Sequence, residues 1–205
     1  MIKILNRILF LLVFGNLVAQ NTSLVNEAKV LPTIDGEVIN DKAWEGISTI
    51  KTFTQKSPDE GNLSTEQTIV KIMYSEKTFY VSVVCYDSDP NKIVITDTRR
   101  DAALDNTDSF MFVLDTYKDQ QNGFVFGTNA GGIEYDAQVS GGGEGMSISS
   151  TRQSVGIGAN YNINWDAAWE VKTKIGDYGW SAEFAIPFKT LRFSNKKNQS
   201  WGANF

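Results

Sequence analysis

The chain has 205 residues, a formal net charge of −5, one cysteine and no histidine. Without histidine it cannot build a Ser-His-Asp triad, a Cys-His dyad, or a histidine-ligated zinc or haem site, and one cysteine allows no internal disulfide. The acidic balance argues against nucleic acid as a partner, because phosphate backbones repel a negative surface. Any catalysis would therefore depend on carboxylates or on metals with oxygen ligands.

The N-terminus has the three parts of a secretory signal peptide. Lys3 and Arg7 are basic, residues 8–14 form an unbroken apolar run, and the small residue Ala19 stands where a signal peptidase would cut. The run is too short for a membrane-spanning helix, which needs about 20 apolar residues. We therefore expect residues 1–19 to be removed and the protein to be exported to the periplasm, the outer membrane or the cell surface.

Alternation of apolar and polar residues predicts strands along most of the remaining chain. The predicted strands, in chain order, are residues 68–74, 79–86, 109–115, 133–140, 169–175 and 180–186. The turns between them are predicted at residues 75–78, 122–123, 129–132 and 176–179. Many short strands joined by glycine-containing turns predict an all-β protein, a jelly-roll-like β-sandwich.

Other segments are predicted to be short helical turns, a loop and an unfinished strand. Asp41 can cap one helical turn over residues 43–45, and residues 98–104 are predicted to form a second. The glycine- and serine-rich residues 140–154 are predicted to form a long loop. Residues 199–205 have the pattern of the start of a strand, so we expect the domain over residues 30–205 to continue further.

Four segments, in this order, resemble the family 9 carbohydrate-binding modules. They are residues 32–36 followed by Trp44, residues 79–87, residues 108–115 and residues 179–188, which contain Gly-Trp-x-x-Glu-x-x-Ile-Pro-Phe. The resemblance covers residues 30–205. It implies a β-sandwich that binds oligo- or polysaccharide by stacking sugar rings on tryptophans and that often carries calcium.

Three further segments resemble a subgroup of these modules. They are residues 99–101, 191–193 and 201–202. In that subgroup the module is the first part of a large bacterial envelope protein and precedes a long β-rich region. The resemblance implies a parent protein of the hydrolase type that is linked to carbohydrate catabolism.

The resemblance also implies which residues contact sugar. Trp165 and Trp169 are the candidate aromatic platforms; Trp169 also fits the inward-facing set of its strand, whereas Trp165 lies outside the alternation. Asp105 occupies the position at which many family members have a second clamp tryptophan. Arg100, from the subgroup motif, is the fourth candidate.

Two other tryptophans and one carboxylate have structural interpretations. Trp44 and Trp180 are predicted to pack in the core, since large aromatic side chains dominate cores. Glu183 faces away from the apolar set of its strand and is expected to accept hydrogen bonds from backbone amides or to form a salt bridge. Gly36 is expected to allow a tight turn, and Cys85 to be a buried small hydrophobe.

Aspartates are concentrated between residues 87 and 108. Asp87, Asp89 and Asp108 are candidate ligands for a structural calcium ion, which takes carboxylate and carbonyl oxygens. An EF-hand is excluded, because Lys92 stands where its loop requires glycine. The alternative is that these carboxylates are solvated side chains of loops.

Three functions stay open from the sequence. The first is a carbohydrate-binding module that is not catalytic by itself. The second is a fragment of a glycan hydrolase, for which Glu134 and Asp136 share a strand face at a separation that two catalytic carboxylates could use, although they also match the polar face of a half-exposed strand. The third is a structural domain that packs on a downstream β-barrel.

Overall fold

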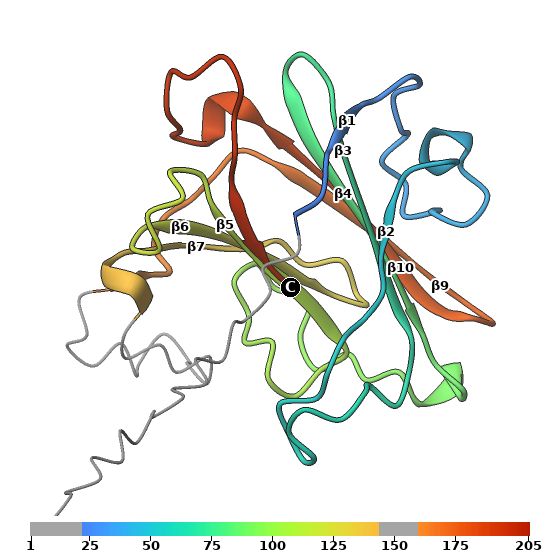
Figure 1. The fold of residues 1–205 in the computed structure, drawn as a ribbon. Coiled ribbons are helices and arrows are strands. Elements are labelled where there is room, and N and C mark those ends of the chain that lie inside the picture. The colour runs from blue at the N-terminus through green and yellow to red at the C-terminus, as the bar shows by residue number, and fades with distance from the viewer. Residues whose placement is uncertain (1–21, 144–159) are drawn as a thin grey trace, which may run out of the picture.

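A computed structural model describes residues 22–143 and 160–205, which form two β-sheets packed face to face (Figure 1). This confirms the predicted all-β sandwich. The predicted signal peptide and most of the predicted loop over residues 140–154 lie outside the described residues. No helix within the two described ranges is long and apolar enough to cross a membrane.

The strands are short, and six of the seven longer strands that the structure describes fall on or beside a predicted range. The strand over residues 123–129 was not predicted, because all of its residues are buried and its apolar residues do not alternate with polar ones. The first sheet contains β1 (Asn26–Glu27), β2 (Thr49–Ile50), β3 (Thr68–Tyr74), β4 (Thr78–Tyr86), β9 (Glu170–Gly176) and β10 (Gly179–Pro187). The second contains β5 (Ser109–Asp115), β6 (Gly123–Asn129), β7 (Tyr135–Val139), β8 (Tyr161–Asn162) and β11 (Gly202–Asn204).

The strand order brings distant parts of the chain together. The first sheet runs β1-β3-β4-β10-β9, with β2 also paired to β3, and the second runs β11-β5-β6-β7-β8. Strand β1 is parallel to β3, and the other strand pairs are antiparallel. The C-terminal β11 therefore forms an edge of the second sheet, beside β5 (Figure 1).

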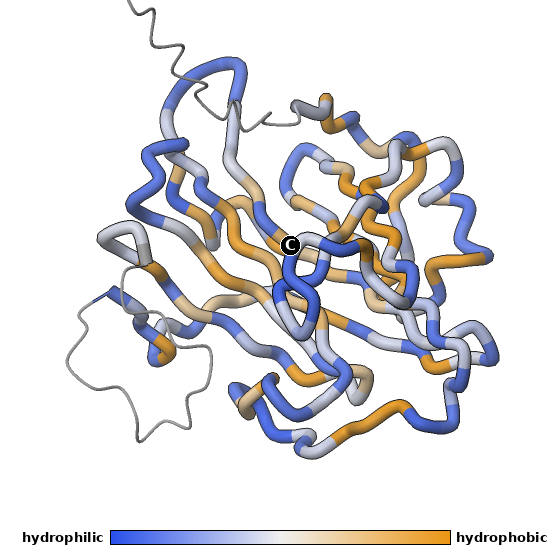
Figure 2. Tube along the Cα trace, turned by 60° about the horizontal axis from the view of Figure 1, so that its bottom comes forward, coloured by the Kyte–Doolittle hydropathy of each residue, from blue (hydrophilic) through white to orange (hydrophobic). Residues whose placement is uncertain are grey.

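The core between the sheets is formed by the apolar sets of five predicted strands. Its buried members include Val70, Phe79, Val81, Val83, Phe110, Phe112, Leu114, Trp169, Val171, Trp180, Ala182, Phe184 and Ile186. Figure 2 shows apolar residues concentrated along the strands and hydrophilic residues on the connecting loops. The period of two thus places these side chains correctly, because alternate residues of a strand point to opposite faces.

The outer face of the first sheet is covered by the segment before β2. Trp44 is completely buried there against Met73, Tyr80 and Val84. The predicted turn at Gly36 has a φ of +86°, and a Cβ atom there would lie 2.5 Å from the backbone carbon of Thr173. Only glycine fits so close an approach to β9 in that conformation.

Glu183 attaches this covering segment to β10. It does so by contacting backbone amides, as predicted. Its Oε2 accepts hydrogen bonds from the amides of Asp35 (3.0 Å) and Gly36 (2.9 Å). Its Oε1 accepts one from the indole of Trp44 at 2.7 Å. Burial raises the pKa of Glu183, although all three donors favour the ionised form.

Strand β7 departs from the prediction that its polar residues line a half-exposed face. The register pairs Asp136 with Phe126, so Asp136 points into the space between the sheets and is completely buried. The apolar Tyr135, Ala137 and Val139 lie on the outer face, where they pack with Leu104 and Ile163. Both faces of β7 are covered, and the polarity of a side chain therefore does not tell which face is inside.

The short helical turns are only partly predicted. Asp41 caps the 3-10 turn Lys42–Trp44, with its Oδ1 accepting from the amide of Ala43 at 2.8 Å, as expected. The prediction of a helical turn over residues 98–104 is wrong, because that segment is a chain of bends and turns. Three further 3-10 turns lie in the described residues: Pro90–Lys92, Gly141–Gly143 and Phe188–Thr190.

Candidate functional site

Arg100 gathers carboxylates from two parts of the chain at the side of the sandwich where β7 and β9 lie. Its guanidinium contacts Glu134, Asp136 at 2.6 Å and Asp166 at 2.7 Å. The loop that carries Arg100 is attached to the start of β7 by a hydrogen bond of 3.0 Å from the amide of Asp101 to the carbonyl of Glu134. The arrangement is an ion-pair network that reaches the surface, since the Arg100 side chain is 37% exposed.

Asp136 is the buried end of this network. Its Oδ2 also accepts a hydrogen bond of 2.7 Å from the indole of Trp169. Burial raises the pKa of Asp136, and the bonds from Trp169 and the charge of Arg100 oppose that rise. Because one guanidinium binds both Glu134 and Asp136, the two carboxylates are held as ion-pair partners and not as a free acid and base.

The two candidate tryptophans lie next to this network, since Trp169 donates to Asp136 and Trp165 precedes Asp166 in the chain. Trp169 is buried in the core, with its ring stacked on Phe184 at a centroid distance of 5.8 Å. Trp165 is half-buried and packs on Phe124, with ring centroids 5.0 Å apart. Of the two, Trp165 is the more exposed residue.

A pocket of about 180 Å³ is lined in part by Phe124, the ring on which Trp165 packs. Its lining includes Tyr117, Asn122, Gln138 and Arg192, together with Phe124 itself. Gln138 follows Asp136 on the same face of β7, and Tyr117 follows the end of β5 with 51% of its surface exposed. The pocket thus combines aromatic side chains with amide and guanidinium side chains, and polar groups of this kind fix the orientation of a ligand in binding sites.

The structure brings together Arg100, Trp165 and Trp169 of the four candidate sugar-contacting residues. The fourth, Asp105, is exposed in the turn that follows the buried Leu104, and its charge acts on Tyr135, whose side chain lies on the outer face of the second sheet. It is therefore directed to a different face from Gln138 and Phe124, which line the pocket.

Of the three candidate calcium ligands, Asp87 and Asp108 accept from backbone amides and Asp89 pairs with a lysine. Asp87 Oδ1 accepts from the amide of Asp89 at 2.7 Å, and Asp108 Oδ2 accepts from the amide of Val94 at 2.7 Å. Asp89 forms an ion pair of 2.9 Å with Lys92. Within residues 22–143 and 160–205, no three acidic, cysteine or histidine side chains are gathered in a way that could hold a metal. These contacts do not fit a shared ligand set, and calcium binding stays a prediction.

Sequence reasoning missed the pocket residues Tyr117, Asn122, Gln138 and Arg192. Gln138 could have been found from the sequence, because the alternation of its strand places it on the same face as Glu134 and Asp136. Tyr117 and Arg192 belong to segments 75 residues apart that meet only in the folded protein. No local pattern in the sequence marks them as neighbours.

No protein-family model matches this sequence, and no curated protein matches it. Two solved structures are similar in fold. A family 9 carbohydrate-binding module from Caldicellulosiruptor kristjanssonii, in complex with cellotriose, has a TM-score of 0.52 and 17% identity, over 87% of this chain and 73% of the module. A putative carbohydrate-binding protein from Bacteroides uniformis has a TM-score of 0.57 and 9% identity, over 87% of this chain and 79% of that one. The chain therefore has a fold like that of the family 9 modules.

Proposed function

We propose that this protein binds carbohydrate, at the side of the sandwich where Trp165 and the pocket meet. The observation that carries the proposal is the half-buried Trp165 ring held on Phe124, which also lines a pocket containing Asn122, Gln138 and Arg192. Sugar rings present C–H groups that pack on aromatic faces, and hydroxyls that pair with amides and guanidinium groups. The family 9 module of similar fold was solved with cellotriose.

The proposed setting is an exported protein, which follows from the signal-peptide pattern of residues 1–19. In this setting the domain attaches a larger envelope protein to the glycan on which the rest of the protein acts. A role in carbohydrate catabolism, and any calcium that stabilises the loops around residues 87–108, belong to the same proposal.

A catalytic role of the domain itself has less support. The one pair of carboxylates that the sequence singled out, Glu134 and Asp136, shares Arg100 as a partner. A glycosidase needs one carboxyl that protonates the leaving oxygen and another that attacks or activates water. Two carboxylates bound to the same cation are not separated in this way.

The proposal is tested by titrating the folded protein with cellotriose and other soluble oligosaccharides, with and without calcium, while measuring heat and tryptophan fluorescence. We expect Trp165→Ala to weaken binding about tenfold or more, because a stacked aromatic anchor contributes strongly to affinity. Tyr86→Ala is the matched control, since Tyr86 packs on Tyr178 on the outer face of the other sheet.

Two results would contradict the proposed carbohydrate binding at this site. One is the absence of any response to every glycan by a protein whose unfolding transition shows it to be folded. The other is unchanged affinity in the Trp165→Ala and Tyr117→Ala variants, which would place binding elsewhere. Release of reducing ends by the isolated domain, lost in Glu134→Gln, would instead favour the hydrolase.

A further inference from the structure

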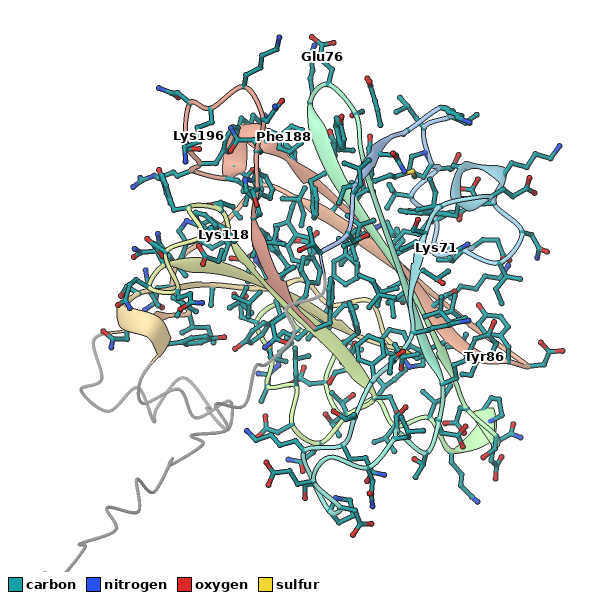
Figure 3. All side chains as sticks on the ribbon, in the orientation of Figure 1. Lys71, Glu76, Tyr86, Lys118, Phe188 and Lys196 are labelled. Carbon is teal, nitrogen blue, oxygen red and sulfur yellow. The ribbon has the colours of Figure 1, made fainter. Side chains whose placement is uncertain are left out.

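Exposed cations are concentrated at the end of the sandwich where the pocket opens. They are Lys118, Lys189, Arg192, Lys196 and Lys197. The hydroxyl of Thr116 donates to the carbonyl of Arg192, and Lys118 Nζ donates to Ser200 at 3.4 Å. Figure 3 shows Lys118, Phe188 and Lys196 on one side of the molecule, away from Tyr86 and Lys71. Segments distant in sequence thus present their positive charges together.

An aromatic cluster holds the segments that carry four of these cations. Phe188, Phe193 and Trp201 contact one another with ring centroids between 5.5 and 6.1 Å apart. Trp201 also contacts Phe79 of β4 at 5.6 Å. The chain from residue 188 to residue 201 is therefore attached to the sandwich at both of its ends, and the backbone that carries these cations is held there.

None of these cations forms an ion pair with a carboxylate within residues 22–143 and 160–205, which is also true of several lysines elsewhere, such as Lys56. Elsewhere Lys92, Arg99, Arg100 and Lys174 each form an ion pair with an aspartate or a glutamate. The result is a positive region on a protein whose net charge is −5.

The two carboxylates of this region bind backbone. Asp115 accepts hydrogen bonds from the amides of Asp119 (3.1 Å) and Gln120 (2.8 Å). Asp119 accepts from the amides of Gln121 and Asn122, both at 2.8 Å. Their oxygens hold the backbone of the loop, and neither forms an ion pair with Arg192 in the part of the chain that the structure describes.

These bonds hold the loop beside the pocket in an unusual conformation. Lys118 and Gln120 have φ values of +55° and +56°, which side chains other than glycine rarely adopt. Strained backbone that surrounding contacts maintain is common at ligand sites. A loop ordered before binding also reduces the entropy lost when a ligand is bound.

We propose that the pocket binds a uronic-acid unit of an acidic glycan, with Arg192 pairing to its carboxylate. A guanidinium matches a carboxylate in two parallel hydrogen bonds. The exposed Tyr117 ring packs on one face of the sugar, and the amides of Asn122 and Gln138 pair with its hydroxyls. The neighbouring lysines attract further carboxylates of the same chain.

The ligand is a polyanion built of sugars and not a nucleic acid or a membrane. The pocket has room for one ring and offers amides for hydroxyls, whereas a duplex or a bilayer needs a broad basic face. The rest of the chain is acidic and would repel an extended phosphate surface. The inference rests on the proposed carbohydrate binding and adds that the bound carbohydrate is anionic.

The test compares a trigalacturonate with its methyl-esterified counterpart by calorimetry on the folded protein. Esterification removes the charge and leaves the rings unchanged. We expect the acid to bind about tenfold more tightly than the ester at moderate ionic strength, and Arg192→Gln to abolish that preference. Lys196→Gln should reduce it by a smaller factor. Lys56→Gln, an exposed cation on the Thr54–Leu63 loop, should leave it unchanged.

Four outcomes separate the possibilities. Loss of the acid-over-ester preference in Arg192→Gln, with the neutral glycan still bound, supports the inference. Equal binding of acid and ester, unaffected by that variant, overturns it and leaves carbohydrate binding in place. Binding of polyglutamate or of a DNA duplex as tightly as trigalacturonate overturns the assignment to a sugar. Absence of binding to trigalacturonate, its ester and cellotriose removes the proposed function together with the inference.

Discussion

Two buried carboxylates, Glu183 and Asp136, lie on different sheets and have similar chemistry but different surroundings. Each is fully buried and accepts a hydrogen bond of 2.7 Å from a tryptophan indole. Glu183 completes its shell with two backbone amides, so all its partners are neutral. Asp136 instead pairs with Arg100, a cation that reaches the surface.

The difference in partners gives the two carboxylates different roles: Glu183 forms a structural contact, whereas Asp136 is linked to the surface. Burial raises the pKa of both groups, and in each the indole bond opposes the rise. Around Glu183 the neutral donors close the site and attach the segment that covers the first sheet. Around Asp136 the ionic partner extends the buried charge to Asp166, beside Trp165. In this protein, therefore, burial of a carboxylate indicates a candidate site only at Asp136, whose partner Arg100 reaches the surface.

The largest effect is expected from Glu183→Ala. The change leaves the indole of Trp44 and the amides of Asp35 and Gly36 without their acceptor, and it creates a cavity under the covering segment. We expect a loss of about 3 kcal/mol in the free energy of unfolding, measured by urea denaturation. Glu170→Ala, an exposed position on β9, is the control. Equal losses in the two variants would show that Glu183 is not a structural contact.

Arg100→Leu should have the next largest effect. It leaves Asp136 buried without a cation, so the pKa of that carboxyl should rise further and the protein should lose stability as the pH increases. Because Arg100 is 37% exposed, we expect a loss of about 2 kcal/mol near neutral pH, less than for a fully buried pair.

The control for Arg100 is Arg99→Leu, since Arg99 is 85% exposed and pairs with Asp97. That variant should lose little stability, as exposed ion pairs contribute little. Thermal or urea unfolding of both variants at several pH values measures whether the loss of Arg100 costs more stability than the loss of Arg99. An Arg100 variant as stable as the Arg99 variant at every pH would contradict the assigned role of Arg100.

Glu183→Gln should show a smaller effect that depends on pH. The raised pKa means that the folded protein keeps a proton on Glu183 at pH values where the unfolded chain has lost it. The stability from this group is therefore complete below the ordinary carboxyl pKa of 4.5 and is lost as pH rises through the folded value. The wild type should lose stability over that window relative to the glutamine variant. A constant difference between the two proteins from pH 4 to pH 8 would contradict the raised pKa.

Asp166→Asn should have the smallest effect on folding. Its side chain is 79% exposed, so its bond to Arg100 is solvated and should contribute below about 0.5 kcal/mol. The matched measurement is Asp136→Asn, in which the buried partner of the same guanidinium changes. If Asp166→Asn destabilised the protein as much as Asp136→Asn, burial would not be what distinguishes members of the network.

Much of the fold could be predicted from local patterns, because each strand carries its own alternation. The apolar sets of β4, β5 and β10 were placed in the core correctly, and Glu183 was directed to backbone amides. Prediction failed over residues 98–104, where hydrogen bonds to other segments replace a helical turn. Asp101 donates to Glu134, and Asn129 donates to the carbonyl of Asp97 at 2.8 Å. A short helix has too few internal bonds to compete with such contacts.

The sequence by itself determined six of the longer strands, their two faces and the candidates Trp165, Trp169 and Arg100, but it missed β6. Only the tertiary structure decided that Asp136 points inward, that Arg100 binds it, and that Tyr117 and Arg192 share a pocket. The physical reason is that alternation distinguishes the two faces of a strand but not which face another layer covers. In β7 both faces are covered, so the pattern of β7 alone does not decide which way Asp136 points. That direction is set by its pairing with Phe126, a residue of the neighbouring strand.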